Sequence, residues 1–217
     1  MRNSPPDAER ANPEKVHVPD KVHVIACGAI AREILAICQT SRLPHIALTC
    51  LPAIWHNTPD KIVPGLEAEI VRLRAEGAEK IYIAYADCGT GGMLDRLCER
   101  QNVRRIPGPH CYSFFAGNEA FDARWSEDLT AFFLTDFLAR QFEAFVVEPL
   151  GLDRHPELRD MYFGHYTKLI YFSQAEDPDL QKKALAAAEF LGLEYEYRFT
   201  GYGDLASEIV NAGTGKM

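Results

Sequence analysis

Short apolar runs alternate with amphipathic segments along most of this chain. Six of the runs have the length and composition of strands, and they cover 22–27, 45–51, 79–86, 103–106, 167–173 and 193–199. Most are followed by helical spacing of apolar residues, as in Ile62, Leu66, Ile70 and Leu73. Strand and helix therefore alternate about five times. This order predicts an α/β fold with a mostly parallel sheet of about five to six strands and helices on both faces.

Three segments of the pattern carry more specific predictions. The run at 79–86 is almost unbroken in apolar residues, which is typical of an interior strand, whereas 193–199 alternates polar and apolar residues as an edge strand does. Between 112 and 166 the pattern becomes irregular and aromatic, and we predict a helical, aromatic insertion packed over the active edge, with a long amphipathic helix over about 129–148. Inside that helix, Asp136 is expected to form an ion pair with Arg140.

The start of the chain differs from the rest. Residues 1–20 are polar and proline-rich and lack the apolar stretch of a signal peptide, so we expect a disordered lead-in there. A single α/β domain is expected over 21–212. No run of 18 apolar residues occurs, which predicts no membrane span.

Composition narrows the class of protein. Hydrophobic residues make up 47% and charged residues 25%, which is ordinary for a globular domain. The net charge of −8 argues against nucleic-acid binding, which usually needs a basic face. Without a signal peptide we expect a cytoplasmic protein, in which the six cysteines are reduced thiols and not a disulfide framework.

Three of these cysteines follow predicted strands at glycine-marked loops. They are Cys27, Cys88 and Cys111. Because the carboxyl ends of parallel strands share one edge of a sheet, we expect the three thiols to meet there. Their meeting would make a metal site or a reactive-thiol site. The remaining cysteines are expected to be core residues, since free cysteine packs like a small hydrophobe; they are Cys38, Cys50 and Cys98.

Two histidines are placed to assist the thiols. His56 follows the second predicted strand, and His110 precedes Cys111 in a stiff PGPH turn. Either could be a fourth ligand or an acid/base group. Three thiolates with an imidazole suit Zn²⁺, and three thiolates alone could hold an iron–sulfur cluster with an open iron. In a metal-free alternative, Cys88 is a nucleophile and His110 its base.

The loop DCGTGG at 87–92 suggests a ligand. Its amides, from Gly89, Thr90, Gly91 and Gly92, could cradle a small anionic substrate at a helix start. Asp87 could orient the ligand or act as a base, or it could simply cap the helix. The loop is not a nucleotide-binding Walker loop, because no Lys-Ser/Thr pair follows it.

Several long motifs resemble one known family. ACGAIAREI, HNTPDKI, YADCGTGGMLD, RIPGPHCY and TGYGDL resemble domain-of-unknown-function family 1638, and the likeness spans about 22–210. Members look like cytoplasmic prokaryotic proteins, often encoded near corrinoid-dependent methyltransferases. The resemblance implies a role in methyl-group or one-carbon metabolism, with a corrinoid protein or methyltransferase as partner. The leading hypothesis is a metal–thiolate protein in this chemistry; the rivals are the metal-free cysteine enzyme and a non-enzymatic cofactor-binding accessory protein.

Overall fold

A computed structural model of the chain describes residues 21–216, so the predicted lead-in at 1–20 lies outside the described residues. The α/β class with parallel strands is confirmed, but the strands form two sheets instead of one. The first sheet has the order β2-β1-β3-β4 and the second β5-β6-β7. The strands are β1 (Val22–Cys27), β2 (Ile46–Leu51), β3 (Lys80–Ala84), β4 (Arg104–Arg105), β5 (Ala131–Leu134), β6 (Lys168–Ser173) and β7 (Glu194–Phe199).

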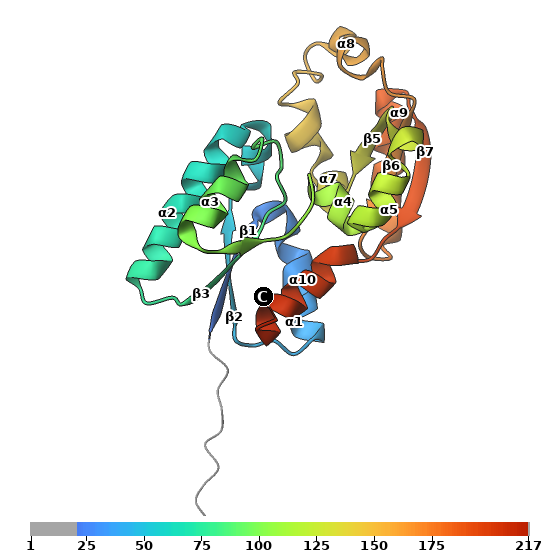
Figure 1. The fold of residues 1–217 in the computed structure, drawn as a ribbon. Coiled ribbons are helices and arrows are strands. Elements are labelled where there is room, and N and C mark those ends of the chain that lie inside the picture. Colours follow the sequence, from blue (N-terminus) through green and yellow to red (C-terminus); the bar gives the residue numbers. More distant parts are fainter. Residues whose placement is uncertain (1–20, 217) are drawn as a thin grey trace, which may run out of the picture.

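The first sheet is the centre of one lobe and has helices on both faces. Helices α2 (Ile62–Ala75) and α3 (Met93–Gln101) cover one face, and α1 (Ala31–Thr40) and α10 (Gly203–Thr214) cover the other (Figure 1). Strand β3 lies between β1 and β4, as its apolar sequence predicted. Helix α10 is the last element of the chain and packs against α1 and α4 (Cys111–Ala116), so both ends of the described chain belong to this lobe.

The second sheet forms the other lobe and buries alternate residues of β6 on opposite faces. Leu169 and Tyr171 pack in one cluster with α9 (Pro178–Leu191). Ile170 and Phe172 pack on the other side with Phe121 of α5 (Asn118–Ala123). Strand β7 pairs with β6 alone, which confirms the predicted edge strand. This sheet therefore also has helices on both faces.

The predicted long helix over 129–148 is wrong. Residues Ala131–Leu134 instead pair with β6 as strand β5, and the Thr135 side chain caps a new helix, α7 (Asp136–Arg140). A π-helix, η4 (Glu143–Val147), follows. Asp136 and Arg140 do form the predicted ion pair, with 3.7 Å between Nη2 and Oδ2.

Short helices make up most of the remaining connections. They are η1 (Gly28–Ile30), η2 (Ala53–Asn57), η3 (Pro59–Lys61), α6 (Trp125–Asp128), η5 (Pro156–Leu158) and α8 (Arg159–Phe163). No helix among residues 21–216 combines the length and the apolar character needed to cross a bilayer. The predicted aromatic segment at 112–166 therefore contains many short helices and also strand β5, which pairs into the second sheet.

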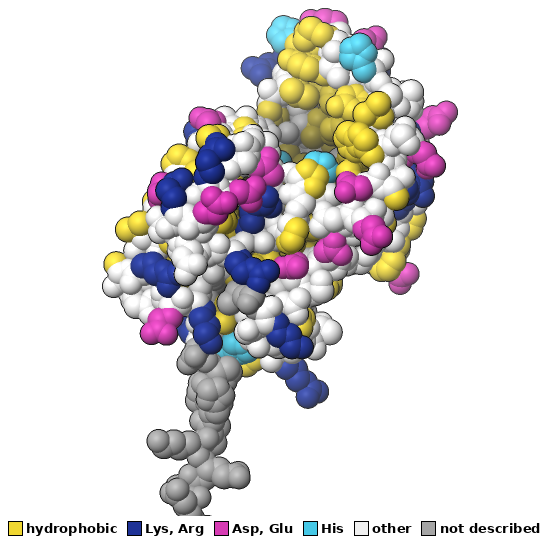
Figure 2. Space-filling model, viewed as in Figure 1, with side chains coloured by type: hydrophobic (Ala, Val, Ile, Leu, Met, Phe, Trp, Pro, Cys, Tyr) yellow, Lys and Arg dark blue, Asp and Glu magenta, His cyan; other side chains and the backbone are white. Residues whose placement is uncertain are grey.

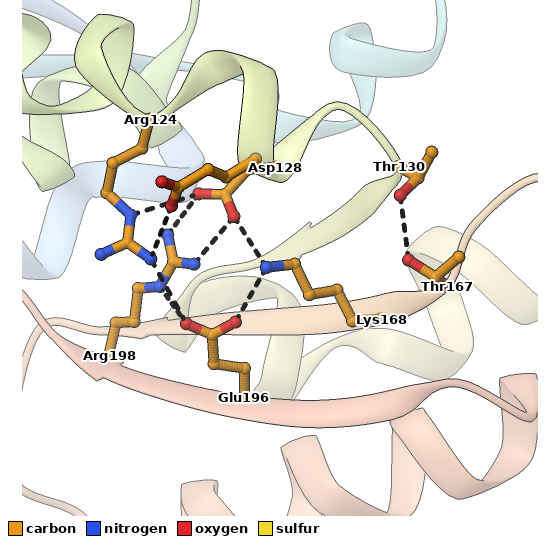
Figure 3. A network of polar contacts seen from close by, with 8 residues as sticks. Arg124, Asp128, Thr130, Thr167, Lys168, Glu196 and Arg198 are labelled. Carbon is orange, nitrogen blue, oxygen red and sulfur yellow. Dashed lines mark hydrogen bonds and ion pairs between the residues drawn. The ribbon is translucent and has the colours of Figure 1, made fainter.

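The buried carboxylate of Asp128 fixes helix α6, which precedes strand β5, against the second sheet. Asp128, at the end of α6, accepts hydrogen bonds from Lys168 Nζ at 2.8 Å and from Arg198 Nη2 at 2.9 Å (Figure 3). Glu196 on β7 accepts from the same Lys168 at 3.0 Å, and Arg124 lies at the rim of the group. Because Asp128 is almost fully buried, these cations are needed to balance its charge.

Candidate functional site

The structure brings the three predicted thiols together. Cys27, Cys88 and Cys111 line one small cavity at the carboxyl edge of the first sheet, which we call the thiol cavity. His56 and Tyr85 also line it. Its volume of about 10 Å³ holds about one water-sized atom. All six cysteines of the chain are free, so none of these thiols is tied up in a disulfide.

Two backbone hydrogen bonds explain why Cys88 and Cys111 meet. The amides of Asp87 and Cys88 donate to the carbonyls of Gly108 and Pro109, at 3.0 and 2.8 Å, and tie the loop after β3 to the PGPH turn. The turn needs glycine at 108, because φ is +116° and a Cβ there would lie 2.4 Å from the nearest side-chain oxygen. The turn then leads directly into Cys111 at the start of α4.

Cys27 and His56 reach the cavity from the neighbouring strands. Cys27 is the last residue of β1 and stands opposite Leu51, the last residue of β2. A Cβ on Gly28 would lie 3.1 Å from the Leu51 carbonyl, so the two strand ends approach closely. The helix η2 that follows β2 carries His56 back to the thiols.

Two local features suggest that the thiol cavity serves a function. Cys88 has φ of +50°, a conformation that costs a non-glycine residue about 1–3 kcal/mol and is concentrated at functional sites. The Tyr85 hydroxyl is buried, and the polar group beside it is the Cys27 thiol. Sulfur is a weak hydrogen-bond partner, so a ligand atom in the cavity would complete the bonding of this hydroxyl.

Burial sets the protonation of the site. It raises the pKa of Cys88 to about 12, with the neighbouring Cys27 and Asp87 adding to the effect. It also raises the pKa values of Cys27 and Cys111 and lowers the pKa of His56. At neutral pH the cavity therefore holds neutral thiols beside a neutral imidazole. Such thiols are poor nucleophiles by themselves, but a soft cation can replace their protons.

A second, larger pocket lies beside the thiol cavity, between the two lobes. Ala29, His56 and Cys111 line both spaces, so the two are neighbours. The large pocket has a volume of about 460 Å³, within the range of small-molecule sites. Figure 2 shows the hydrophobic hollow between α2, α3 and the segment that carries α8. Most of its wall is apolar and comes from the second lobe: Phe132, Phe137, Leu138, Phe145, Leu150 and Phe163.

These aromatic residues were not singled out as site residues from the sequence. They come from the irregular segment 112–166, where the only signal was a high density of aromatic residues without a clear period. Cys111 is half-buried and lines the large pocket as well as the thiol cavity. The pocket thus opens onto the thiols.

The glycine loop is arranged differently from the predicted anion cradle. Asp87 itself accepts hydrogen bonds from the Thr90 hydroxyl at 2.7 Å and from the amides of Gly91 and Gly92 at 3.1 and 2.9 Å. These contacts lower the pKa of Asp87, so its carboxylate is charged. A ligand anion would have to displace this carboxylate. Asp87 therefore acts as a local cap in this structure, and neither it nor Gly89 lines either cavity.

His110 also has a local role. Its Nδ1 accepts a hydrogen bond from the Ser113 amide at 3.3 Å and caps α4. The ring packs edge-on against Phe121, with 5.1 Å between centroids. It lines neither the thiol cavity nor the large pocket, so the imidazole beside the thiols is that of His56.

The other three cysteines lie away from the thiol cavity lining. Cys98 is buried in the core as predicted, and Cys38 is half-buried. Cys50 is exposed, so the core prediction is wrong for this residue. The reason is that β2 is an edge strand, with one side of its backbone and part of its faces uncovered.

As the side chains stand, no group of three or more His, Cys, Asp or Glu residues within the described chain has a geometry that could hold a metal ion. The donor chemistry nevertheless fits a metal ion, since three thiols and an imidazole surround one cavity.

Among known proteins, a family model described as a protein of unknown function, DUF1638, matches residues 50–209. No curated protein and no solved structure matches the chain.

Proposed function

Because the chain belongs to the DUF1638 family, whose description assigns no activity, we propose a function from the site itself: the protein holds a thiophilic metal centre on Cys27, Cys88 and Cys111. The observation that supports it is the convergence of three free thiols on one small cavity. Three thiols at one point are a donor set that Zn²⁺ prefers.

The size of the thiol cavity favours a single ion over a cluster. A volume of about 10 Å³ accepts about one atom, and an iron–sulfur cluster would need the surrounding loops to open. The thiols would have to move from their present positions to coordinate the ion, since no group of three ligands among the described residues is placed to hold one. His56 is neutral and faces the same cavity, so it can act as a fourth ligand or accept a proton. The Tyr85 hydroxyl can donate to a coordinating sulfur.

The substrate would occupy the large pocket, next to Cys111 and His56. A thiolate-bound metal supplies a Lewis acid and a stabilised thiolate nucleophile. Methyl-group transfer, which the family resemblance implies, is our proposal for the reaction. The pocket of about 460 Å³ is smaller than a corrinoid, so a corrinoid protein would have to dock outside it.

Elemental analysis with an optical spectrum, on protein purified without air, tests the metal proposal. We expect about one zinc per chain and no visible band. Cys88→Ser should lose the metal, whereas Cys38→Ser should keep it because Cys38 lines neither cavity. Iron with sulfide would identify the cluster alternative.

A metal-free, colourless protein, or a Cys88→Ser variant with full metal content, would overturn the proposal. In the first case the cysteine-nucleophile alternative would require one fast-reacting thiol. The raised thiol pKa values argue against such a thiol.

A further inference from the structure

The lining of the large pocket disfavours a charged ligand. None of the described residues that line it is Lys, Arg, Asp or Glu. A charged ligand would lose its hydration here without gaining an opposite charge.

Few of the lining side chains can form hydrogen bonds, and they are His56, Asn57, Cys111, Tyr112 and Thr135. His56 is at the boundary with the thiol cavity, and Asn57 follows it on the same short helix. Thr135 also lines the pocket, but its hydroxyl accepts from the Leu138 amide as the cap of α7. The His56 ring nitrogens can take part in hydrogen bonds with a ligand. A bound molecule therefore meets mainly apolar side chains, with His56 as a polar partner at the boundary with the thiol cavity.

The helix that carries part of the wall is unusual. Phe145 and Val146 belong to the π-helix η4, a conformation that is rare and frequent at functional sites. The Phe145 ring packs edge-on against Phe137 of α7, with 4.9 Å between centroids. The extra residue in the helical turn thus helps to build an aromatic wall facing the pocket.

From these observations we propose that the large pocket binds an uncharged, mainly apolar small molecule, with its single hydrogen-bonding group toward His56. This ligand differs from the anion that the glycine loop suggested. Such an anion would need the amides of Gly91 and Gly92, which already donate to the Asp87 carboxylate. The inference goes beyond the metal proposal and does not depend on it, since it uses the pocket wall alone.

Two fluorescent probes with the same aromatic body test it in the full chain. N-phenyl-1-naphthylamine is uncharged, and 8-anilino-1-naphthalenesulfonate carries one sulfonate. We expect one site per chain for the neutral probe and at least tenfold weaker binding of the sulfonate. Phe137→Asp should weaken the neutral probe at least tenfold. Leu185→Asp is the matched control, because Leu185 is 42% exposed on α9 and lines neither cavity. Equal affinity for both probes would overturn the proposal.

A second measurement needs no variant. In chelator-treated protein, a saturating amount of the neutral probe should slow alkylation of Cys111 by N-ethylmaleimide at least tenfold, while the exposed Cys50 reacts at its original rate. An unchanged Cys111 rate would overturn the proposal. Metal analysis of the protein as purified, before the chelator is added, separates the two ideas. Probe binding by a protein that is purified without metal overturns only the metal proposal, and a metal-containing protein that does not bind the probe overturns only this one.

Discussion

Loading the thiol cavity with zinc should release protons, and their number tests whether three buried thiols are the ligands. A cysteine coordinates a metal as the thiolate, so each neutral thiol loses one proton on binding. Burial raises the pKa of Cys88 to about 12 and also raises the pKa values of Cys27 and Cys111. Burial lowers the pKa of His56, which is therefore neutral at pH 7.5 and releases none. We expect about three protons per zinc at that pH.

The pH dependence separates buried thiols from exposed ones. Three ordinary thiols with pKa near 8.5 would be mostly ionised at pH 9 and would together release less than about one proton. The buried set should still release about two to three, because at least Cys88 and Cys111 remain protonated there. Between pH 6.5 and 8.5, the apparent zinc affinity should rise by about three powers of ten per pH unit.

Calorimetric titration of the metal-free protein, in buffers with different ionisation enthalpies, gives the proton count directly. Cys88→Ser should release about two protons at pH 7.5 and bind zinc more weakly. Cys38→Ser should match the parent, since Cys38 lies on α1 away from both cavities. Stoichiometric zinc binding with a release near zero or one would refute coordination by the three thiols.

Three further predictions concern stability and the loop that positions Cys88. Asp128→Asn should lower the free energy of unfolding by about 3 kcal/mol, since Arg198 loses its buried partner. The Arg198 guanidinium holds the pKa of Asp128 well below 3.8, so this stabilisation is complete above pH 3.8 and is lost only as the pH falls from there toward the lowered pKa. The difference between the urea unfolding curves of parent and variant should therefore begin to narrow only below pH 3.8. Glu33→Gln should stabilise by about 1 kcal/mol at pH 7, because burial raises the pKa of Glu33 and its Oε2 has no hydrogen-bond partner among the described residues. The native state keeps that proton longer than the unfolded state, so the advantage should grow above pH 4.5 in thermal melts; an advantage independent of pH would contradict this cause. Gly108→Ala should cost about 2 kcal/mol and weaken zinc binding, whereas Gly77→Ala, also at positive φ but in open space, should leave zinc binding unchanged in the same titration.

The convergence of the thiols could be predicted from the sequence, because it depends only on which residues end neighbouring parallel strands. Cys27 ends β1, and Cys88 follows β3 after a few residues; because these strands are parallel neighbours, their carboxyl ends share one edge. The same rule could not decide the role of Asp87, because helix capping and ligand binding use the same carboxylate. Only its hydrogen bonds to Thr90 and the following amides show that the carboxylate is already engaged.

Strand β5 could not be predicted in the same way. A short apolar run such as Ala131–Leu134 has no period that separates a strand from one turn of a buried helix. Its state depends on pairing with β6, more than thirty residues later, in the register Phe132↔Leu169. Missing this pairing led to one predicted sheet where there are two, and it hid the aromatic wall that β5 and α7 contribute to the large pocket.

The second sheet changes the chemistry that the first can support. A single parallel sheet would leave its carboxyl edge open to water, and thiols there would have nearly ordinary pKa values. Here Phe132 of β5 and Phe137 of α7 face the same pocket as Cys111, so the second lobe covers that edge with apolar surface. The second lobe thus adds to the burial of Cys111, whereas Cys27 and Cys88 are buried against the core of the first sheet. A metal that replaced the thiol protons would meet its substrate in an environment from which water is largely excluded, where its charge acts most strongly.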